Sequence, residues 1–242
     1  MSTQKTTPRS PRTDGEATRA RLLEAAGQLF SQQGFAETTG KAIAQRAGAD
    51  LASINYHFGN RNGLYQTVLL EAHRQILDLE DLQRIASSGL SAPQRLHALL
   101  TGLVQRAQQP EAWAPRVLAR ELLAPSSHLQ VLLAEAIPPK IIVVAQMLSE
   151  ISGIPIDDPA LLRCLLSVAA PCMMLIVIGR DLPGPLQPVM QGASQALVSH
   201  LHSFAIAGLE AVGKEYRDKA AAGKANPSPT LPFAARKGGS KR

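Results

Sequence analysis

The fold is decided by residues 40–63, which read GKAIAQRAGADLASINYHFGNRNG. This stretch contains two runs of eight residues, 40–47 and 51–58, and a glycine follows each run directly, Gly48 and Gly59. Glycine readily adopts the backbone conformation that ends a helix. The pattern therefore predicts two short helices that are joined by a tight turn.

Side chains that can cap helices stand where these helices should begin. Thr38 or Thr39 can offer an oxygen to the first backbone N–H groups of the helix at 40–47. Asp50 can do the same for the second helix, and Asn60 for a helix that should follow. The caps and the glycines thus predict the same helix boundaries.

The second predicted helix has two unlike sides. At about 100° per residue, Leu51, Ile54 and Phe58 share the side that should face a core. The other side is small, polar and aromatic, and consists of Ala52, Ser53, Tyr56 and His57, with Asn55 on its flank. Small residues allow a helix to enter a DNA major groove about 12 Å wide, and longer polar residues can reach its phosphates. The two helices are therefore typical of a DNA-binding helix-turn-helix.

The chain between residues 21 and 70 resembles the N-terminal domain of TetR-family transcriptional regulators. The resemblance is carried by Ala25, Phe30, Gly34-Phe35, Thr38-Thr39, Ile43-Ala44, Ala47-Gly48, Tyr56-His57-Phe58, Arg61 and Leu64-Tyr65. Arg61 stands where the family usually has Lys, and Asn62 where it usually has an acid. Further along, ARELLAPS at 119–126 and DDPALLRCLLSV at 157–168 are similar to the CecR-type subgroup.

The resemblance implies roles for seven residues in DNA binding. Thr39 and Lys41 would touch phosphate at the start of the first helix of the motif, and His57 and Arg61 would hold the DNA backbone. The residues that would face bases or sugars are Ser53, Asn55 and Tyr56. Simpler roles remain open: Thr39 as a cap alone, Lys41 as a solvated charge, and Tyr56 and His57 as packing residues.

Composition and pattern predict an all-α protein with about nine helices. Hydrophobic residues make up 45% of the 242 residues and aromatic residues only 4%, which favours helices packed on helices over strands. Before the motif, a first helix is expected from Asp14 and should end at Gly34. Beyond the motif, helices are expected at 64–85, from Pro93, at 113–123, from Ser126 or Ser127 with an interruption at Pro138-Pro139 and a continuation at 141–151, at 160–179 and at 187–212. The expected domains are a disordered basic tail at 1–13, a DNA-binding domain at 14–62, a regulatory and dimerisation domain at 63–213 and a second basic tail at 214–242.

The last two expected helices predict a homodimer. Residues 160–178, in a helix expected at about 160–180, are apolar on nearly all sides. Residues 187–212 are rich in Gly, Ala and Ser, which allow helices to approach closely. A two-fold dimer would present two recognition helices to successive major grooves of a palindromic operator. The alternative is that both helices are buried within one chain.

A pocket for a small hydrophobic or amphipathic effector is expected among the helices between residues 93 and 180. Candidates by residue type are Trp113, Arg116, Arg120, His128 and Met173, each of which could equally be structural. We expect no cofactor. We also expect no metal site at His200 and His202, because these residues are two positions apart on a helix and point in different directions.

The sequence predicts a cytoplasmic protein with no membrane partner. The N-terminus lacks the apolar segment of an export signal. The sixteen residues between Arg163 and Arg180 would span about 24 Å as a helix, less than the roughly 30 Å hydrocarbon core of a bilayer.

Taken together, these features predict a dimeric transcriptional repressor whose affinity for its operator falls when the effector binds. An enzyme is disfavoured, because the sequence has neither a nucleophile elbow, an HExxH motif nor a Gly-rich phosphate loop. An architectural DNA-binding protein that relies on its basic ends is the other alternative, and would bind DNA without regard to sequence.

Overall fold

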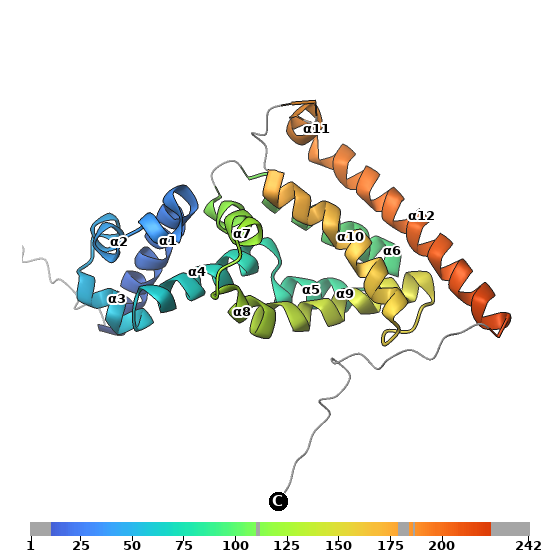
Figure 1. Ribbon diagram of the computed structural model, residues 1–242, viewed down its shortest axis with the longest axis horizontal. Coiled ribbons are helices and arrows are strands. Elements are labelled where there is room, and N and C mark those ends of the chain that lie inside the picture. The colour runs from blue at the N-terminus through green and yellow to red at the C-terminus, as the bar shows by residue number, and fades with distance from the viewer. Residues whose placement is uncertain (1–10, 110–111, 179–183, 186, 224–242) are drawn as a thin grey trace, which may run out of the picture.

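The structure is a computed structural model, and it describes residues 11–109, 112–178, 184–185 and 187–223. Within these residues the chain forms α-helices and one π turn, and no strand occurs. The predicted all-α fold is therefore confirmed. The helices form a small N-terminal bundle at one end of an elongated molecule and a larger bundle at the other, as Figure 1 shows.

Three helices make up most of the N-terminal bundle: α1 (Pro11–Glu37), α2 (Gly40–Ala47) and α3 (Leu51–Phe58). The helical path of α1 is interrupted at Gly34, whose φ of 82° suits a residue without a side chain. This glycine was expected to end the first helix. Helix α1 begins three residues before the expected boundary at residue 14, and residues 1–10 of the expected basic tail lie outside the described residues.

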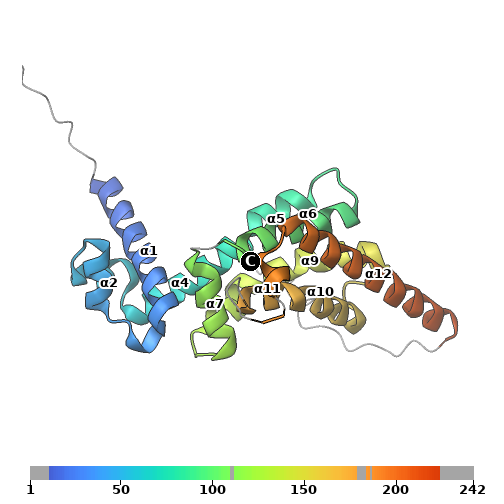
Figure 2. The ribbon, with the colours of Figure 1, turned by 90° about the horizontal axis from the view of Figure 1, so that it is seen from above.

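The single helix expected at 64–85 is two helices, α4 (Arg61–Ile76) and α5 (Leu79–Ala86). The break lies at Leu77, which has an extended backbone with φ −141° and ψ 95°. Asp78 then caps α5, because its side chain accepts hydrogen bonds from the N–H groups of Glu80 and Asp81. Figure 2 shows α4 as the connection between the two bundles.

The larger bundle contains the remaining helices: α6 (Ala92–Ala107), α7 (Trp113–Leu123), α8 (Leu129–Val131), a π turn (Leu132–Ala136), α9 (Ile137–Ser152), α10 (Pro159–Ile178), α11 (Gln187–Gln191) and α12 (Ser194–Ala221). Pro138 and Pro139 were expected to interrupt a helix, but they lie in the first turn of α9, where a missing N–H costs little. The predicted helix at 187–212 is divided into α11 and α12.

The basic tail expected from residue 214 begins as helix, since α12 continues to Ala221. Two contacts hold this end of α12 against the bundle. The Tyr216 hydroxyl donates to Asp158 over 2.8 Å, and Arg217 donates to the Ser152 carbonyl over 2.9 Å. The rest of the expected tail, residues 224–242, lies outside the described part of the chain.

Two hydrophobic clusters hold the molecule together. One combines buried residues of α1–α4 with those of α7, and the other joins α5, α6, α9, α10 and α12. Helix α7 belongs to the larger bundle in sequence and packs on α10 there, and it also packs on α1 and α4. This arrangement places α7 between the motif and the rest of the chain (Figure 1).

By length and composition alone, three stretches of the described chain could cross a bilayer: Leu129–Ser152, Pro159–Val177 and Ser194–Ala221. The helix that was expected to be too short to cross a bilayer, residues 164–179, is part of a longer one, because α10 begins at Pro159 and includes Arg163. In the structure these stretches pack against one another within the larger bundle.

Candidate nucleic-acid interface and internal cavity

The turn between α2 and α3 is fixed by local hydrogen bonds. Thr39 caps α2 by accepting a hydrogen bond from the Ala42 N–H over 3.1 Å, and Gly48 ends this helix with φ 60° and ψ 41°. Asp50 caps α3, since its carboxylate accepts from both the N–H and the hydroxyl of Ser53, at 2.7 and 2.8 Å. These bonds hold the pKa of Asp50 below its ordinary value. The predicted caps are confirmed.

The outer side of α3 is open to solvent. Tyr56 is 84% exposed, whereas Ile54, on the opposite side, is 2% exposed. His57 is half-buried, and its ring centroid lies 4.8 Å from that of Tyr56. The prediction that Leu51 faces the core is wrong: its side chain is 54% exposed, because at the first position of α3 it lies beyond the edge of the buried cluster.

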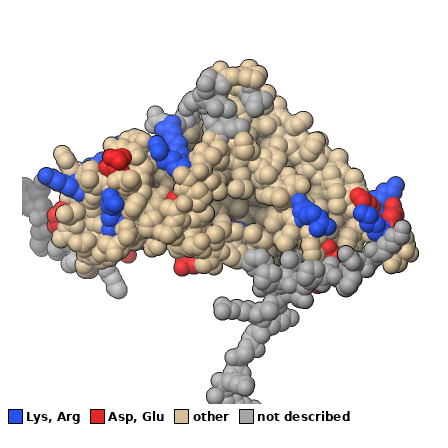
Figure 3. Space-filling view, in the orientation of Figure 1, with Lys and Arg blue, Asp and Glu red and all other residues tan. Residues whose placement is uncertain are grey.

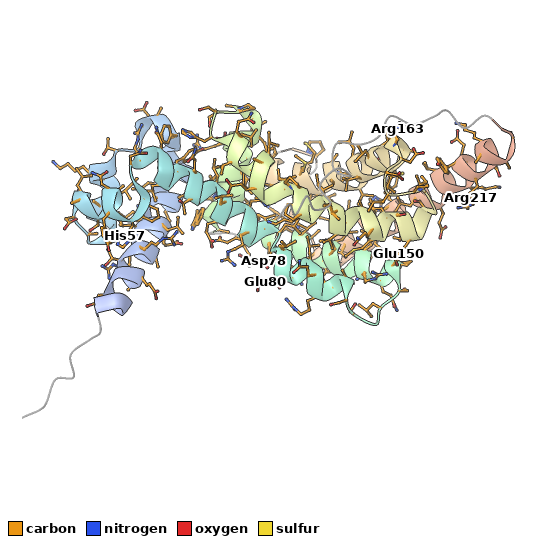
Figure 4. All side chains as sticks on the ribbon, turned by 90° about the horizontal axis from the view of Figure 1, so that it is seen from below. His57, Asp78, Glu80, Glu150, Arg163 and Arg217 are labelled. Carbon is orange, nitrogen blue, oxygen red and sulfur yellow. The ribbon has the colours of Figure 1, made fainter. Side chains whose placement is uncertain are left out.

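Most of the residues predicted to bind DNA lie on exposed parts of the motif. Thr39, Lys41 and Asn55 are exposed at the surface of α2 and α3. Ser53 is half-buried, and its hydroxyl is engaged by Asp50. Figure 4 shows His57 near the free end of the N-terminal bundle.

Arg61 makes two contacts within the N-terminal bundle. Its guanidinium donates to the Thr38 carbonyl over 2.7 Å and lies over the Phe35 ring, 4.3 Å from the centroid. These contacts join the start of α4 to the turn before α2. The expected contact of Arg61 with the DNA backbone remains a prediction.

Three of the residues predicted to bind an effector join α7 or the following loop to the N-terminal bundle. The Trp113 indole N–H donates to Glu24 over 2.8 Å. Arg120 donates to the carbonyls of Ser31 and Gln32 over 3.0 and 2.9 Å. The His128 ring packs against two aromatic rings: its centroid lies 5.0 Å from that of Phe35 and 5.3 Å from that of Tyr65. Arg116 is exposed on α7.

A cavity of about 390 Å³ lies within the larger bundle. Its wall is almost wholly apolar and is supplied by α4, α6, α7, α8, α9 and α10 together with the π turn. Figure 3 shows a hollow in the surface between α7, α9 and α10. Among the predicted effector residues, Met173 lines this cavity and Trp113, Arg116, Arg120 and His128 do not.

The sequence interpretation missed two ionisable residues of the cavity wall, His73 and Lys140. Lys140 Nζ lies 2.8 Å from His73 Nδ1. Burial, and secondarily the charge of Lys140, lower the pKa of His73 to about 4, so His73 is neutral at pH 7. The available signal was Lys140 itself, the single charge among the apolar residues 136–145.

Glu121 connects the cavity wall to the N-terminal bundle. One carboxylate oxygen accepts from the Tyr65 hydroxyl over 2.9 Å, and the other accepts from the N–H and the hydroxyl of Ser126 over 2.9 and 2.7 Å. Burial raises the pKa of Tyr65, with the hydrogen bond to Glu121 as the second cause. Tyr65 belongs to α4, so this bond joins α4 to α7.

The outward sides of α10 and α12 expose several large apolar side chains. Leu166 is 66% exposed and Phe204 74% exposed, and Met174 and Val212 are also exposed. A side chain at Gly208 would meet no atom within 4 Å. Both helices also contribute inward-facing residues to the core, so each is only partly buried within one chain.

Comparison with known proteins identifies both parts of the chain. Residues 22–68 match the family described as bacterial regulatory proteins, tetR family. Residues 92–211 match the C-terminal domain of the HTH-type transcriptional dual regulator CecR. The chain therefore belongs to the TetR family, with a C-terminal domain of the CecR type.

Individual relatives match mainly through the N-terminal part. The HTH-type transcriptional regulator TtgR of Pseudomonas putida is 37% identical over 65 residues, which are 27% of this chain and 31% of TtgR. The regulator BetI 1 of Chromohalobacter salexigens is 32% identical over 93 residues, 37% of this chain and 44% of the relative. The matched stretches thus span less than half of these relatives.

Solved structures resemble the fold over most of its length. The fatty acid degradation regulator FadR from Bacillus halodurans has a TM-score of 0.62 at 15% identity and covers 84% of this chain and 98% of its own. FadR from Bacillus subtilis, solved in complex with stearoyl-CoA, has a TM-score of 0.59 at 13% identity and covers 78% and 98%. At this identity the likeness concerns the fold.

Proposed function

We propose that this chain is a dimeric transcriptional repressor that binds a palindromic DNA operator and is released by a small hydrophobic or amphipathic effector. The observation that carries the proposal is the outer side of α3, where Tyr56 is 84% exposed beside Asn55 on a helix with both ends capped. The family relationship supports a DNA-binding regulator rather than an enzyme.

The motif is suited to a major groove. The exposed residues of α3 include Ala52, which is small enough for close approach to base pairs, and Tyr56 near the other end of the helix. The N-terminal ends of α2 and α3 would face phosphates, and Thr39 and Lys41 lie at the first of them. Asn55 and Tyr56 would read bases or sugars, while His57 would contact the backbone.

A dimer would cover the exposed apolar side of α10 and α12. Phe204, Ala207, Gly208, Ala211 and Val212 are exposed at helical spacing on α12, and small residues there permit close approach of a second copy. Such a dimer presents two recognition helices to grooves about 34–36 Å apart. We therefore assign dimerisation and effector binding to α5–α12 and DNA binding to α1–α3, with α4 shared.

Release by an effector requires a connection between the cavity and the motif. Helix α4 provides one, because His73 lines the cavity while Tyr65, two turns earlier, packs in the N-terminal cluster. Helix α7 provides a second through Glu121, Trp113 and Arg120. A ligand that shifts α4 or α7 would favour one placement of α3 over another. The expected cytoplasmic location belongs to the same proposal.

The test begins with selection of bound fragments from the source genome, followed by footprinting. Fluorescence anisotropy on the selected site should show that Tyr56→Ala weakens binding by about 5–150-fold, as expected for a lost contact of about 1–3 kcal/mol. Gln83→Ala, an exposed change on α5, is the matched control and should leave affinity unchanged.

Sedimentation and circular dichroism of both variants should match the wild type. Normal affinity in the Tyr56 variant would refute the assignment of α3 as recognition helix. Retention of fragments without sequence preference, with a steep salt dependence, would favour the architectural alternative over a repressor.

A further inference from the structure

A buried cation stands in the wall of the apolar cavity. Lys140 is 6% exposed and lines the cavity from the first turn of α9. The rest of the wall is apolar apart from His73 and Glu121. A charged group taken out of water is costly unless a partner compensates for the lost hydration.

The contacts of Lys140 leave much of its hydrogen-bonding capacity unused. An ammonium group has three N–H donors, and the side-chain contact that the structure describes for Lys140 is with the neutral imidazole of His73. Within the described residues, Lys140 forms no ion pair with a carboxylate within 4 Å. Burial accordingly lowers the pKa of Lys140, despite the opposing effect of Asp78.

The nearby carboxylates are engaged elsewhere. Asp78 forms an ion pair with Arg74 over 3.4 Å and caps α5 with its other oxygen. Both oxygens of Glu121 accept hydrogen bonds from Tyr65 and Ser126. Lys140 is therefore the positive group on the cavity wall whose charge is not neutralised by an adjacent acid.

We infer that the cavity binds an anionic amphipathic molecule, with a carboxylate at Lys140 and an apolar chain or ring system along the walls of α6, α7 and α10. The inference rests on the proposed function in taking this cavity as the effector site. Its volume of about 390 Å³ lies within the range of about 300–1,000 Å³ usual for small-molecule sites. The apolar wall supplies affinity, and the Lys140–carboxylate bond supplies selectivity for charge.

This binding mode also places the anion beside the end of α4. His73 lies one turn before the C-terminus of α4 and contacts Lys140 directly. A carboxylate would bind the unused N–H donors of Lys140 and draw the ammonium toward itself, so the bond to His73, and with it the position of α4, would respond to the ligand. A neutral apolar ligand would fill the same space without changing this bond.

The test compares ligands with the same chain and different charge. Isothermal titration calorimetry of the full chain without DNA would measure decanoate, 1-decanol and decyltrimethylammonium. Decanoate should bind roughly 10-fold or more tightly than 1-decanol, as expected for a charge-assisted hydrogen bond, and the cation should bind most weakly. Lys140→Met should remove the preference for decanoate while retaining 1-decanol, and Lys140→Arg should keep the preference.

Lys214→Met, an exposed change on α12, is the control for loss of a positive charge and should leave all three affinities unchanged. Equal affinity for decanoate and 1-decanol, binding of none of the ligands, or an unaltered preference in Lys140→Met would each overturn the inference. Because these measurements omit DNA, a chain that shows the preference but selects no operator would contradict the proposed function and leave the ligand class standing.

Discussion

Gly27 is the position where the packing between α1 and α7 leaves least room. A Cβ added there would lie 2.5 Å from Cε2 and 2.7 Å from Cε3 of Trp113, whereas carbon atoms pack at about 3.5–4.0 Å. In Gly27→Ala the indole must therefore retreat by about 1 Å. It cannot do so freely, because its N–H is bonded to Glu24 and its ring is 6% exposed.

The expected cost is a balance of two effects. Overpacking of this kind costs about 1–3 kcal/mol, and weakening the bond to Glu24 adds to that cost. Alanine in place of glycine within a helix stabilises the folded chain by about 1 kcal/mol, which offsets part of this cost. We expect Gly27→Ala to lower the free energy of unfolding by about 2 kcal/mol, which corresponds to a decrease in Tm of about 4–8 °C for a chain of this size.

Urea unfolding followed by far-ultraviolet circular dichroism measures this change. Gly102→Ala is the matched control, because a Cβ there meets only the flexible end of Arg106 at 3.2 Å, and it should be neutral or stabilising. In a Trp113→Leu background, Gly27→Ala should no longer destabilise. The reasoning would be refuted if Gly27→Ala were as stable as Gly102→Ala, or if its cost were the same with leucine at position 113.

Three further changes test other contacts. Tyr65→Phe should cost about 1–3 kcal/mol in urea unfolding, because Glu121 loses a donor while it is buried; an unchanged midpoint would contradict the bond. His73 has a folded pKa of about 4 against an ordinary 6.5, so the unfolded chain takes up the proton first and stability should fall as the pH decreases through that range. His73→Gln should remove up to about 3 kcal/mol of this acid destabilisation, and equal pH profiles for variant and wild type would count against the buried neutral imidazole. Ala207→Glu should convert the dimer to a monomer in sedimentation velocity, while Ala134→Glu, exposed on the π turn, should not; an unaffected sedimentation coefficient for Ala207→Glu would place the interface elsewhere.

The features predicted correctly from the sequence depend on neighbouring residues. Thr39, Asp50 and Asn60 cap the helices that follow them, and Gly48 ends α2. Each of these interactions joins residues no more than four positions apart, so the order of the residues contains the information. The break before α5 had a similar local signal in Asp78, which the apolar periodicity of 64–85 outweighed in our interpretation.

The contacts that the sequence could not predict join distant helices. The bond of Arg61 to the Thr38 carbonyl depends on how α4 leaves the bundle. Lys140 and His73 are 67 positions apart and meet because α4 and α9 pack on the same cavity. Residue type alone favoured Trp113 and Arg120 as ligand contacts, although their partners lie 89 positions away on α1.

Because α4 is one continuous helix, a small rotation about one end displaces the other end by a larger distance. With 16 residues the helix is about 24 Å long. A tilt of about 5° pivoting near His73, about 18 Å from the start of the helix, would carry the first turn of α4, and with it α3, through roughly 1.5 Å, a few times the tolerance of a hydrogen bond to a base edge. As Figure 4 shows, Asp78, which follows the end of α4, lies between His57 and Arg217 along the molecule. A movement that starts near the cavity would thus be transmitted through α4 to the DNA-binding end.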